Sequence, residues 1–113
     1  MRALSREDIL APRPVKTLAV PTPAWGEDTC VYVRLLSVSE RGKFAEIIKD
    51  HAGEMHIRCL LLFCTDEVGK PLFTDADATR LAQEHFAVVD DIVAKGIEFN
   101  GFGRQAVDDA KKN

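Results

Sequence analysis

The feature that most constrains this chain is a short segment that is apolar around its whole circumference. In EMHIRCLLLFCTD, residues 54–66, helical spacing produces two apolar stripes: Met55, Cys59 and Leu62 on one, and Ile57, Leu60, Leu61 and Cys64 on the other. A helix that is apolar on both faces is either buried at the centre of a fold or keeps one face for a partner. The rest of the chain must therefore supply elements that cover this helix.

Length and charge limit the class of protein. The 113 residues, 46% of them hydrophobic, are enough for one domain with one core and too few for two. The net charge of −3 and the scattered lysines and arginines argue against nucleic acid as a partner. No apolar run is long enough to span a bilayer, and the N-terminal segment is too polar for a signal peptide. We therefore expect a soluble, intracellular protein with no membrane partner.

The three cysteines, Cys30, Cys59 and Cys64, all lie within apolar stretches. An odd number of cysteines in such surroundings is typical of reduced thiols buried in a core rather than of a disulfide framework. We expect all three to be buried and free.

Two strand-like segments precede the first long helix. Residues 15–20 and 29–36 are rich in β-branched and apolar residues, and Pro21 and Pro23 end the first of them. The simplest pairing is an antiparallel hairpin, which is marginal alone and must lean on helices. Trp25, in the connection, is predicted to anchor the turn to the helices, with its indole N–H donating to a carbonyl.

Two capping boxes mark helix starts. Ser37 with Glu40 forms an S-x-x-E box, after which Phe44, Ile47, Ile48 and His51 form an apolar stripe that Gly53 ends. Thr74 with Asp77 forms a T-x-x-D box. After the second box, helical spacing continues to Gly96, with a kink expected near residues 83–84, and a helix stop follows at Asn100-Gly101 between two phenylalanines.

These elements predict an α+β fold that is mainly α-helical, with an N-terminal β-hairpin packed on a bundle of about four helices. Residues 1–14 carry two prolines and several charges and are expected to form a flexible arm with at most one helical turn. Residues 15–105 form the single globular domain, and residues 106–113 form a frayed polar tail.

No arrangement of residues predicts catalysis or metal binding. His51, His56, Cys59 and Cys64 are ligand types that zinc prefers. On one helix, however, Cys64 would lie about 140° around from Cys59, so the four could not converge. Burial would also make the thiols inert as nucleophiles. The acidic residues match no calcium loop, and Gly101-Phe102-Gly103 matches no phosphate loop. We expect no catalytic residue, no cofactor and no metal, and a binding or assembly protein rather than an enzyme.

Three segments in a fixed order resemble the tail assembly chaperones of phages with long non-contractile tails. The first, residues 23–44, is a Pro-x-Trp-Gly turn into a strand that ends in a Ser-x-x-Glu-Arg helix start. The second, residues 58–73, is an apolar helix running into Asp-Glu-x-Gly-Lys-Pro-Leu-Phe, and the third is TDADATRLAQEHFAVVDDIV, residues 74–93. Here the matching residues are Pro23, Trp25, Gly26, Ser37, Glu40, Arg41, Asp66, Glu67, Gly69, Lys70, Pro71, Leu72 and Phe73. The resemblance covers roughly residues 8–105.

The resemblance implies a non-enzymatic role in virion assembly. Such chaperones coat the long, helical tape measure protein, keep it soluble and help tail tube subunits polymerise around it. They act in the host cytoplasm and are absent from the mature virion. In many relatives a programmed frameshift yields a longer form that recruits the tail tube protein, and Lys111-Lys112-Asn113 is compatible with a slippery site.

Such a role requires an apolar surface presented in many copies, which predicts a homo-oligomer. The candidate partner or self-association surface comprises Trp25, Tyr32, Met55, Cys59, Leu62 and Phe63. The alternative is that these side chains are simply core. Two other functions stay open: a monomeric adaptor or regulatory domain that binds one folded partner, and a minor structural protein of the virion such as a tail completion factor.

Overall fold

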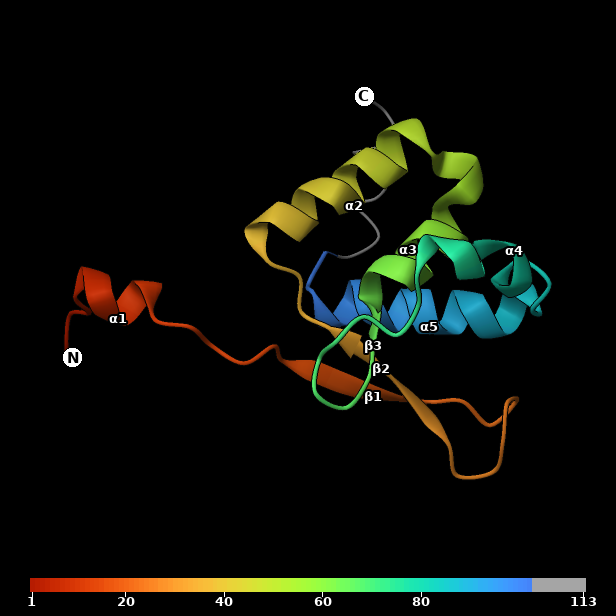
Figure 1. Ribbon diagram of the computed structural model, residues 1–113, viewed down its shortest axis with the longest axis horizontal. Helices are drawn as coiled ribbons and strands as arrows, with labels where there is room; N and C mark the ends of the chain where they lie inside the picture. Colours follow the sequence, from red (N-terminus) through yellow and green to blue (C-terminus); the bar gives the residue numbers. More distant parts are fainter. Residues whose placement is uncertain (103–113) are drawn as a thin grey trace.

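The computed structural model describes residues 1–102 and confirms a mainly helical α+β fold (Figure 1). The predicted tail, the possible frameshift site and residues 103–105 of the predicted domain lie outside the described residues. The helices are α1 (Arg6–Leu10), α2 (Val38–Asp50), α3 (Met55–Phe63), α4 (Ala78–Leu81) and α5 (Phe86–Phe99), and the strands are β1 (Thr17–Pro21), β2 (Cys30–Arg34) and β3 (Cys64–Thr65). Short 3₁₀ turns at Ala52–Glu54 and Asp75–Asp77 precede α3 and α4.

The predicted hairpin is present, and a third strand extends it. β1 and β2 pair antiparallel with Val20 opposite Val31, and β2 also pairs with β3, so β2 is the central strand. β3 has only two residues and follows α3 directly. Sequence patterning missed it because Cys64 and Thr65 continue the apolar helical run.

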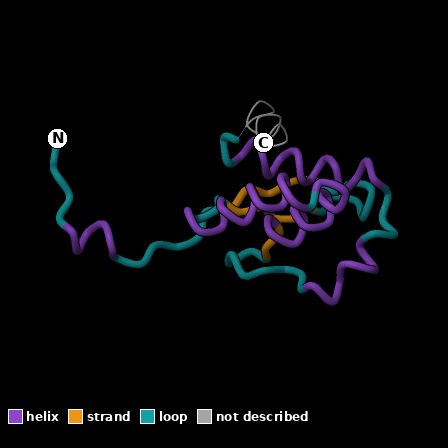
Figure 2. The backbone as a smooth tube through the Cα atoms, turned by 90° about the horizontal axis from the view of Figure 1, so that it is seen from above, coloured by secondary structure: helices purple, strands orange, loops and turns teal. Residues whose placement is uncertain are grey.

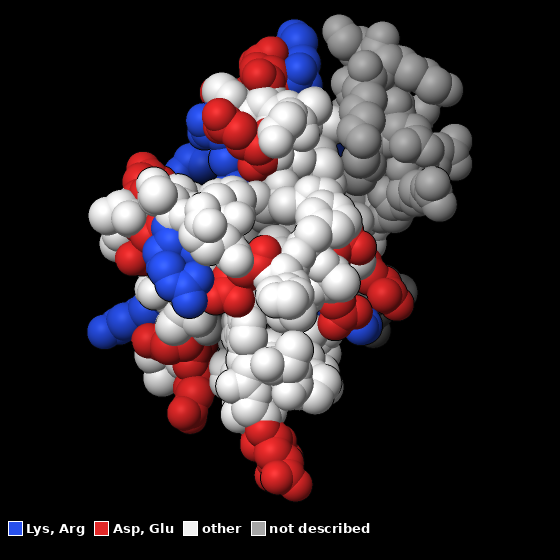
Figure 3. Space-filling view, turned by 90° about the vertical axis from the view of Figure 1, so that its right-hand side faces the viewer, with Lys and Arg blue, Asp and Glu red and all other residues white. Residues whose placement is uncertain are grey.

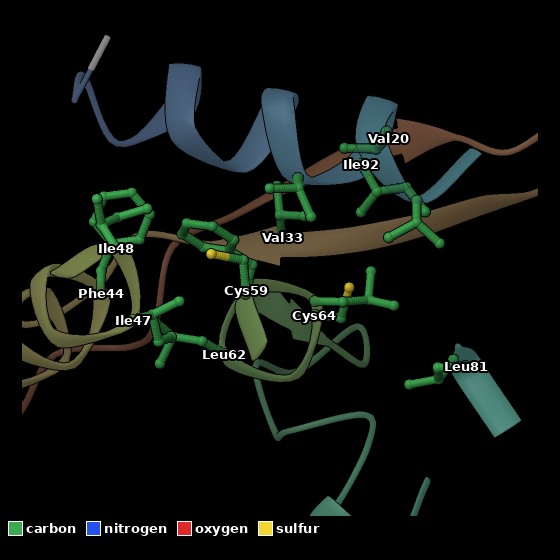
Figure 4. Close-up of a cluster of buried hydrophobic side chains, with 14 residues drawn as sticks. Val20, Val33, Phe44, Ile47, Ile48, Cys59, Leu62, Cys64, Leu81 and Ile92 are labelled. Carbon is green, nitrogen blue, oxygen red and sulfur yellow. The ribbon is translucent and has the colours of Figure 1, made fainter. Parts of the chain in front are cut away.

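The apolar segment is the central helix of the fold, as predicted. α3 packs against α5 and α2, and α5 packs in turn on the sheet. The core therefore lies between the sheet and three helices. Figure 4 shows Val33 of β2 and Cys59 of α3 inside this core, with Val20 of β1 beside Ile92 of α5.

The first capping box is formed as predicted. The Ser37 Oγ accepts from the Glu40 N–H at 3.1 Å, and the Glu40 carboxylate accepts from the Ser37 N–H at 2.9 Å. The other Glu40 oxygen binds Arg34 at 2.8 Å, and the Arg34 Nε–H donates to the carbonyl of Leu62 at 2.8 Å. One network thus joins the end of β2, the start of α2 and the last turn of α3.

The second predicted helix is divided into two. A helical turn does begin after Thr74, whose N–H donates to the Asp77 carboxylate at 2.8 Å. α4 ends at Leu81, however, because the next bonds run from Gln83 to Arg80 and from Glu84 to Leu81, which tightens the backbone. His85 is extended and precedes α5, which then continues past Gly96 to Phe99. The expected kink is therefore a complete break.

The N-terminal arm projects from the body of the molecule. Figures 1 and 2, two views at right angles, both show α1 standing away from the other helices. All of residues 1–14 are exposed. The single helical turn that the sequence predicts is α1, which Ser5 caps with a full capping box.

The cysteines differ in their surroundings. Cys59 and Cys64 are buried, as predicted, and burial raises the pKa of each thiol to about 12. Cys30 is exposed, so the prediction for this residue is wrong. It begins β2 opposite Pro21, and its apolar sequence neighbours alternate with it across the strand, which leaves Cys30 on the outer side.

Candidate protein-binding surfaces

Three of the residues predicted as a partner surface lie in the core. Cys59 and Phe63 are 0% exposed and Leu62 is 9% exposed. Their side of α3 is covered by the sheet, α2 and α5. They therefore form no outer surface of the single chain, because the core of this fold takes that stripe of the helix. Met55 and Tyr32 are half-buried, and an interface role for them stays a prediction.

Trp25 lies at the surface and is fixed by a polar contact. Its indole N–H donates to the Glu84 carboxylate at 3.2 Å, rather than to a carbonyl as predicted. Arg80 holds the other oxygen of Glu84 at 2.9 Å, one helical turn away. The indole is thus tied to the α4–α5 connection while 38% of the residue stays exposed. A rigid, partly exposed tryptophan with its donor satisfied is typical of a protein-binding anchor.

A second exposed aromatic residue follows Glu84 in the chain. Phe86, two residues after Glu84, begins α5 and is 65% exposed. One side of its ring packs on His56 of α3, with 4.5 Å between ring centroids, and His56 is itself held by Asp90 at 2.8 Å. One side of the Phe86 ring is therefore packed against His56, and the rest of the side chain is open to solvent.

A small cleft lies between the hairpin loop and α5. It has a volume of about 180 Å³ and is lined by residues 21–24 on one wall and by Ala87, Val88, Asp91 and Ile92 on the other. We call the exposed set Pro23, Ala24, Trp25, Phe86 and Ala87 the aromatic patch. Figure 3, which views this end of the molecule, shows an uncharged strip with acidic side chains on both sides and basic side chains on its left.

A groove follows the other side of α3. Two adjoining cavities of about 440 and 620 Å³ share Arg58, Leu61 and Asp75 in their walls, and Ile57 and Leu61 supply apolar surface to the second. The accessible part of α3 therefore includes the half-buried Ile57 and Leu61, whereas Leu60 and Cys64 of the same stripe are buried, as are Cys59 and Leu62 of the other. Periodicity showed that both stripes were apolar, but it could not show how much of each the rest of the chain would cover.

The described residues hold no cluster of metal ligands, and the two core thiols are poorly reactive. Within residues 1–102, no three His, Cys, Asp or Glu side chains are placed to hold a metal ion. The two core thiols, with pKa values of about 12, stay protonated at neutral pH and are poor nucleophiles. Over the same range, no helix combines the length and the apolarity needed to cross a membrane.

A similar fold is found among solved structures. The structure of the bacteriophage HK97 tail assembly chaperone superimposes on this chain with a TM-score of 0.59, over 80% of this chain and 86% of that one, at 15% sequence identity. This chain shares the fold of a phage tail assembly chaperone. The resemblance seen in the sequence motifs is thus confirmed at the level of the fold. No protein-family model matches the sequence, and no curated protein is significantly similar to it.

The shared fold gives the matched motifs a structural meaning. The Asp-Glu-x-Gly-Lys-Pro segment forms a tight loop after β3, in which the Asp66 carboxylate accepts from the N–H groups of Val68 and Lys70 at 2.9 and 3.0 Å. Gly69 adopts φ +89°, and a Cβ there would lie 2.8 Å from Val15. The motif therefore specifies a loop that packs on the strand entering the sheet.

Proposed function

We propose that this protein is a phage tail assembly chaperone that binds the tape measure protein, keeps it soluble and promotes assembly of the tail tube. The observation that carries the proposal is the shared fold with the HK97 chaperone across most of both chains. The ordered motifs support it independently, because two different kinds of similarity point to the same family. On this proposal the protein acts by binding, without catalysis and without a cofactor.

The aromatic patch is the surface that we assign to the client. An amphipathic helix presents apolar side chains at intervals of three and four residues, and a groove or patch with rigid aromatic anchors suits such a ligand. Trp25 and Phe86 are held in place by Glu84 and His56, so little side-chain entropy is lost on binding. Weak single contacts would become strong when many copies line one long client.

The wider course of assembly follows from the same proposal. The chaperone would act as a homo-oligomer in the host cytoplasm and leave before the tail is complete, so it would be absent from the mature virion. A frameshifted longer form would recruit the tail tube protein.

Co-expression with the tape measure protein of the same phage tests the proposal. We expect an affinity pull-down of the tape measure protein to recover it in soluble form with many copies of this chain, and light scattering to give the stoichiometry. An insoluble tape measure protein beside a free monomer of this chain would favour the adaptor function instead. Finding this chain in purified virions would favour the structural function.

A matched pair of variants tests the surface. Phe86→Ala removes an exposed ring of the aromatic patch, whereas Val68→Ala changes a residue that is 74% exposed on the loop after β3. Neither side chain is part of the core, so both variants should fold normally. At concentrations below the dissociation constant, we expect Phe86→Ala to reduce the number of copies recovered per tape measure chain by about tenfold or more. Val68→Ala should leave that number unchanged. Equal recovery with both variants would remove the aromatic patch from the proposal.

A further inference from the structure

The helix of the N-terminal arm is fully formed although it touches no other helix. The Ser5 Oγ accepts from the Asp8 N–H at 3.1 Å, and the Asp8 carboxylate accepts from the Ser5 N–H at 3.0 Å. At the other end, the Arg13 guanidinium donates to the carbonyls of Ile9 and Asp8 at 2.7 and 3.0 Å. A five-residue helix is unstable alone in water, so caps at both ends indicate an element that is prepared for a binding site.

The apolar side of this helix is uncovered. Leu4 precedes the N-cap and Ile9 is the fourth helical residue, positions that lie together at the start of a helix. Leu4, Ile9 and Leu10 are 54%, 53% and 62% exposed. Three large apolar side chains on one short helix favour contact with another apolar surface.

A cleft of matching character lies where the arm joins the body. It has a volume of about 780 Å³, with residues 13–16 on one wall and residues 34–37 with Glu40 on the other. Val15 and Leu35 in these walls are 46% and 36% exposed, and Val38, next to Ser37, is 94% exposed. We call this the arm cleft.

Exposed apolar residues concentrate on these two features. Twelve large hydrophobic residues are exposed in the described chain, and seven of them belong to the arm or to the surroundings of the arm cleft: Met1, Leu4, Ile9, Leu10, Val15, Leu35 and Val38. The arm and its cleft lie at the same end of the molecule (Figure 1). The same end of the protein thus provides both an apolar helix, α1, and an apolar cleft.

The arm and its cleft offer one complementary pair of charges. The first turn of α1 carries Arg6, Glu7 and Asp8; Asp8 lies 3.7 Å from Arg2, whereas Glu7 forms no ion pair within residues 1–102. In the arm cleft, Arg34 is neutralised by Glu40 at 2.8 Å, which leaves Arg13 and Lys16 as a net positive charge. The Glu7 carboxylate therefore suits the basic cleft.

The helix is held away from the cleft of its own chain. The Arg13 bonds to Asp8 and Ile9 lock the junction between α1 and the strand, and Pro12 and Pro14 restrict the backbone on both sides of it. The result is the projecting arm of Figure 2. A second copy, in contrast, can bring its own α1 to this cleft without changing either junction.

From these observations we propose that two copies of this protein exchange their N-terminal arms, each α1 docking in the arm cleft of the other. Because donor and acceptor lie at one end of the molecule, the exchange is reciprocal and closes as a two-fold dimer. Leu4, Ile9 and Leu10 then bury against Val15, Leu35 and Val38, and Glu7 faces Lys16. This assembly needs no tape measure protein, so its test is independent of the proposed function.

The oligomeric state of the full-length chain in the absence of client tests the proposal. We expect the wild-type protein to sediment as a dimer, and both Ile9→Asp and Val38→Asp to raise the dissociation constant by about tenfold or more, since each places a charge in the apolar contact. Phe86→Asp, at an exposed residue of the aromatic patch, is the control and should remain a dimer. Circular dichroism should show the same helix content for all three variants, because the altered side chains lie outside the core.

Charge exchange and cross-linking identify the pairing. Glu7→Lys and Lys16→Glu should each weaken the dimer, and the double variant should restore it. In a Cys30→Ser background, a chain with Ile9→Cys should cross-link through a short bismaleimide to a separate chain with Val38→Cys. A wild-type monomer at all concentrations, equal weakening by Phe86→Asp, or cross-linking only within a chain that carries both cysteines would overturn the proposal.

Discussion

Gly96 of α5 packs closely against Phe63 of α3. A Cβ added there would lie 2.9 Å from the ring of Phe63, which is itself fully buried and has no room to move. Alanine is worth about 1 kcal/mol over glycine in a helix, whereas overpacking a core costs about 1–3 kcal/mol. The close approach therefore explains a glycine in the last turn of α5.

This contact predicts opposite effects for two helical glycines. Gly96→Ala should lower the free energy of unfolding by about 1 kcal/mol or more, because the steric cost exceeds the gain in helix propensity. Gly42→Ala, in α2 with nothing within 4 Å of the added Cβ, should raise it by about 0.5–1 kcal/mol. Urea denaturation of the two variants measures the difference, and stabilisation by both would show that the Phe63 contact is unimportant.

The burial of each cysteine predicts which thiols an alkylating reagent modifies. At pH 8, iodoacetamide should modify exposed Cys30 rapidly and spare Cys59 and Cys64, whose thiols burial keeps protonated up to a pKa of about 12. All three should react in denaturant. Mass spectrometry measures the modification of each thiol. Fast modification of all three thiols in the native protein would contradict the burial of Cys59 and Cys64.

The raised pKa values of the two buried thiols also predict how the stability of the protein changes with pH. Above a pH of about 9 the unfolded chain loses these protons, while the folded chain keeps them until about 12. The unfolded state then binds fewer protons, so stability present below pH 9 should fall as the pH rises toward 12. Between pH 8 and 10.5, urea unfolding of Cys64→Ala should show a shallower decline than the wild type; an identical slope would count against this linkage.

At the scale of elements, Asn100 joins the end of α5 to the β2–α2 connection. Its Oδ1 accepts from the Leu36 N–H at 2.8 Å, and its Nδ2 donates to the carbonyls of Arg34 and Gly96 at 3.0 and 2.8 Å. The chain then turns at Gly101, with φ +70°, and brings Phe102 onto Phe44, 4.8 Å between ring centroids. The helix stop predicted at Asn100-Gly101 is thus also a contact between distant segments.

Replacing Asn100 should therefore cost more than the loss of a helix cap. Asn100→Asp keeps the acceptor for Leu36 but turns the donor into an oxygen that faces two carbonyls. We expect the free energy of unfolding to fall by about 2–3 kcal/mol, because part-buried groups lose their partners. Gln83→Ala, an exposed change in the α4–α5 connection, should shift it by less than about 0.5 kcal/mol. Chemical denaturation compares the two, and similar small shifts would contradict the structural role of Asn100.

At the scale of the whole molecule, the aromatic patch and the arm lie on different parts of the surface. Trp25 and Phe86 belong to the hairpin loop and the start of α5, whereas the arm cleft lies at the root of β1 and the start of α2. On our proposals, client binding and self-association would then proceed at the same time, and each dimer would present two client sites.

This separation predicts how the two surfaces combine. Val38→Asp should leave the affinity of a single copy for a tape measure peptide unchanged, yet reduce capture of the full-length tape measure protein by about tenfold or more, because linked sites are lost. Phe86→Ala should weaken both. Isothermal titration with the peptide and pull-down of the full-length client separate these effects, and a loss of peptide affinity in Val38→Asp would show that the surfaces are coupled.

The sequence by itself determined the local features of this protein. The caps at Ser37 and Thr74, the hairpin between two strands and the apolar character of α3 depend on residues within a few positions of one another, and the structure confirms each. The ordered motifs also led to the correct fold family. Short-range hydrogen bonds and side-chain periodicity carry this information directly.

Only the tertiary structure decided which surfaces remain free. It buried Cys59, Leu62 and Phe63, left Ile57 and Leu61 in a groove, added β3, and broke the helix before His85. It also brought Glu84 to Trp25, 59 residues away in the chain. These outcomes depend on how segments that are distant in the sequence pack against one another. That packing involves the whole chain and is not specified by any local pattern.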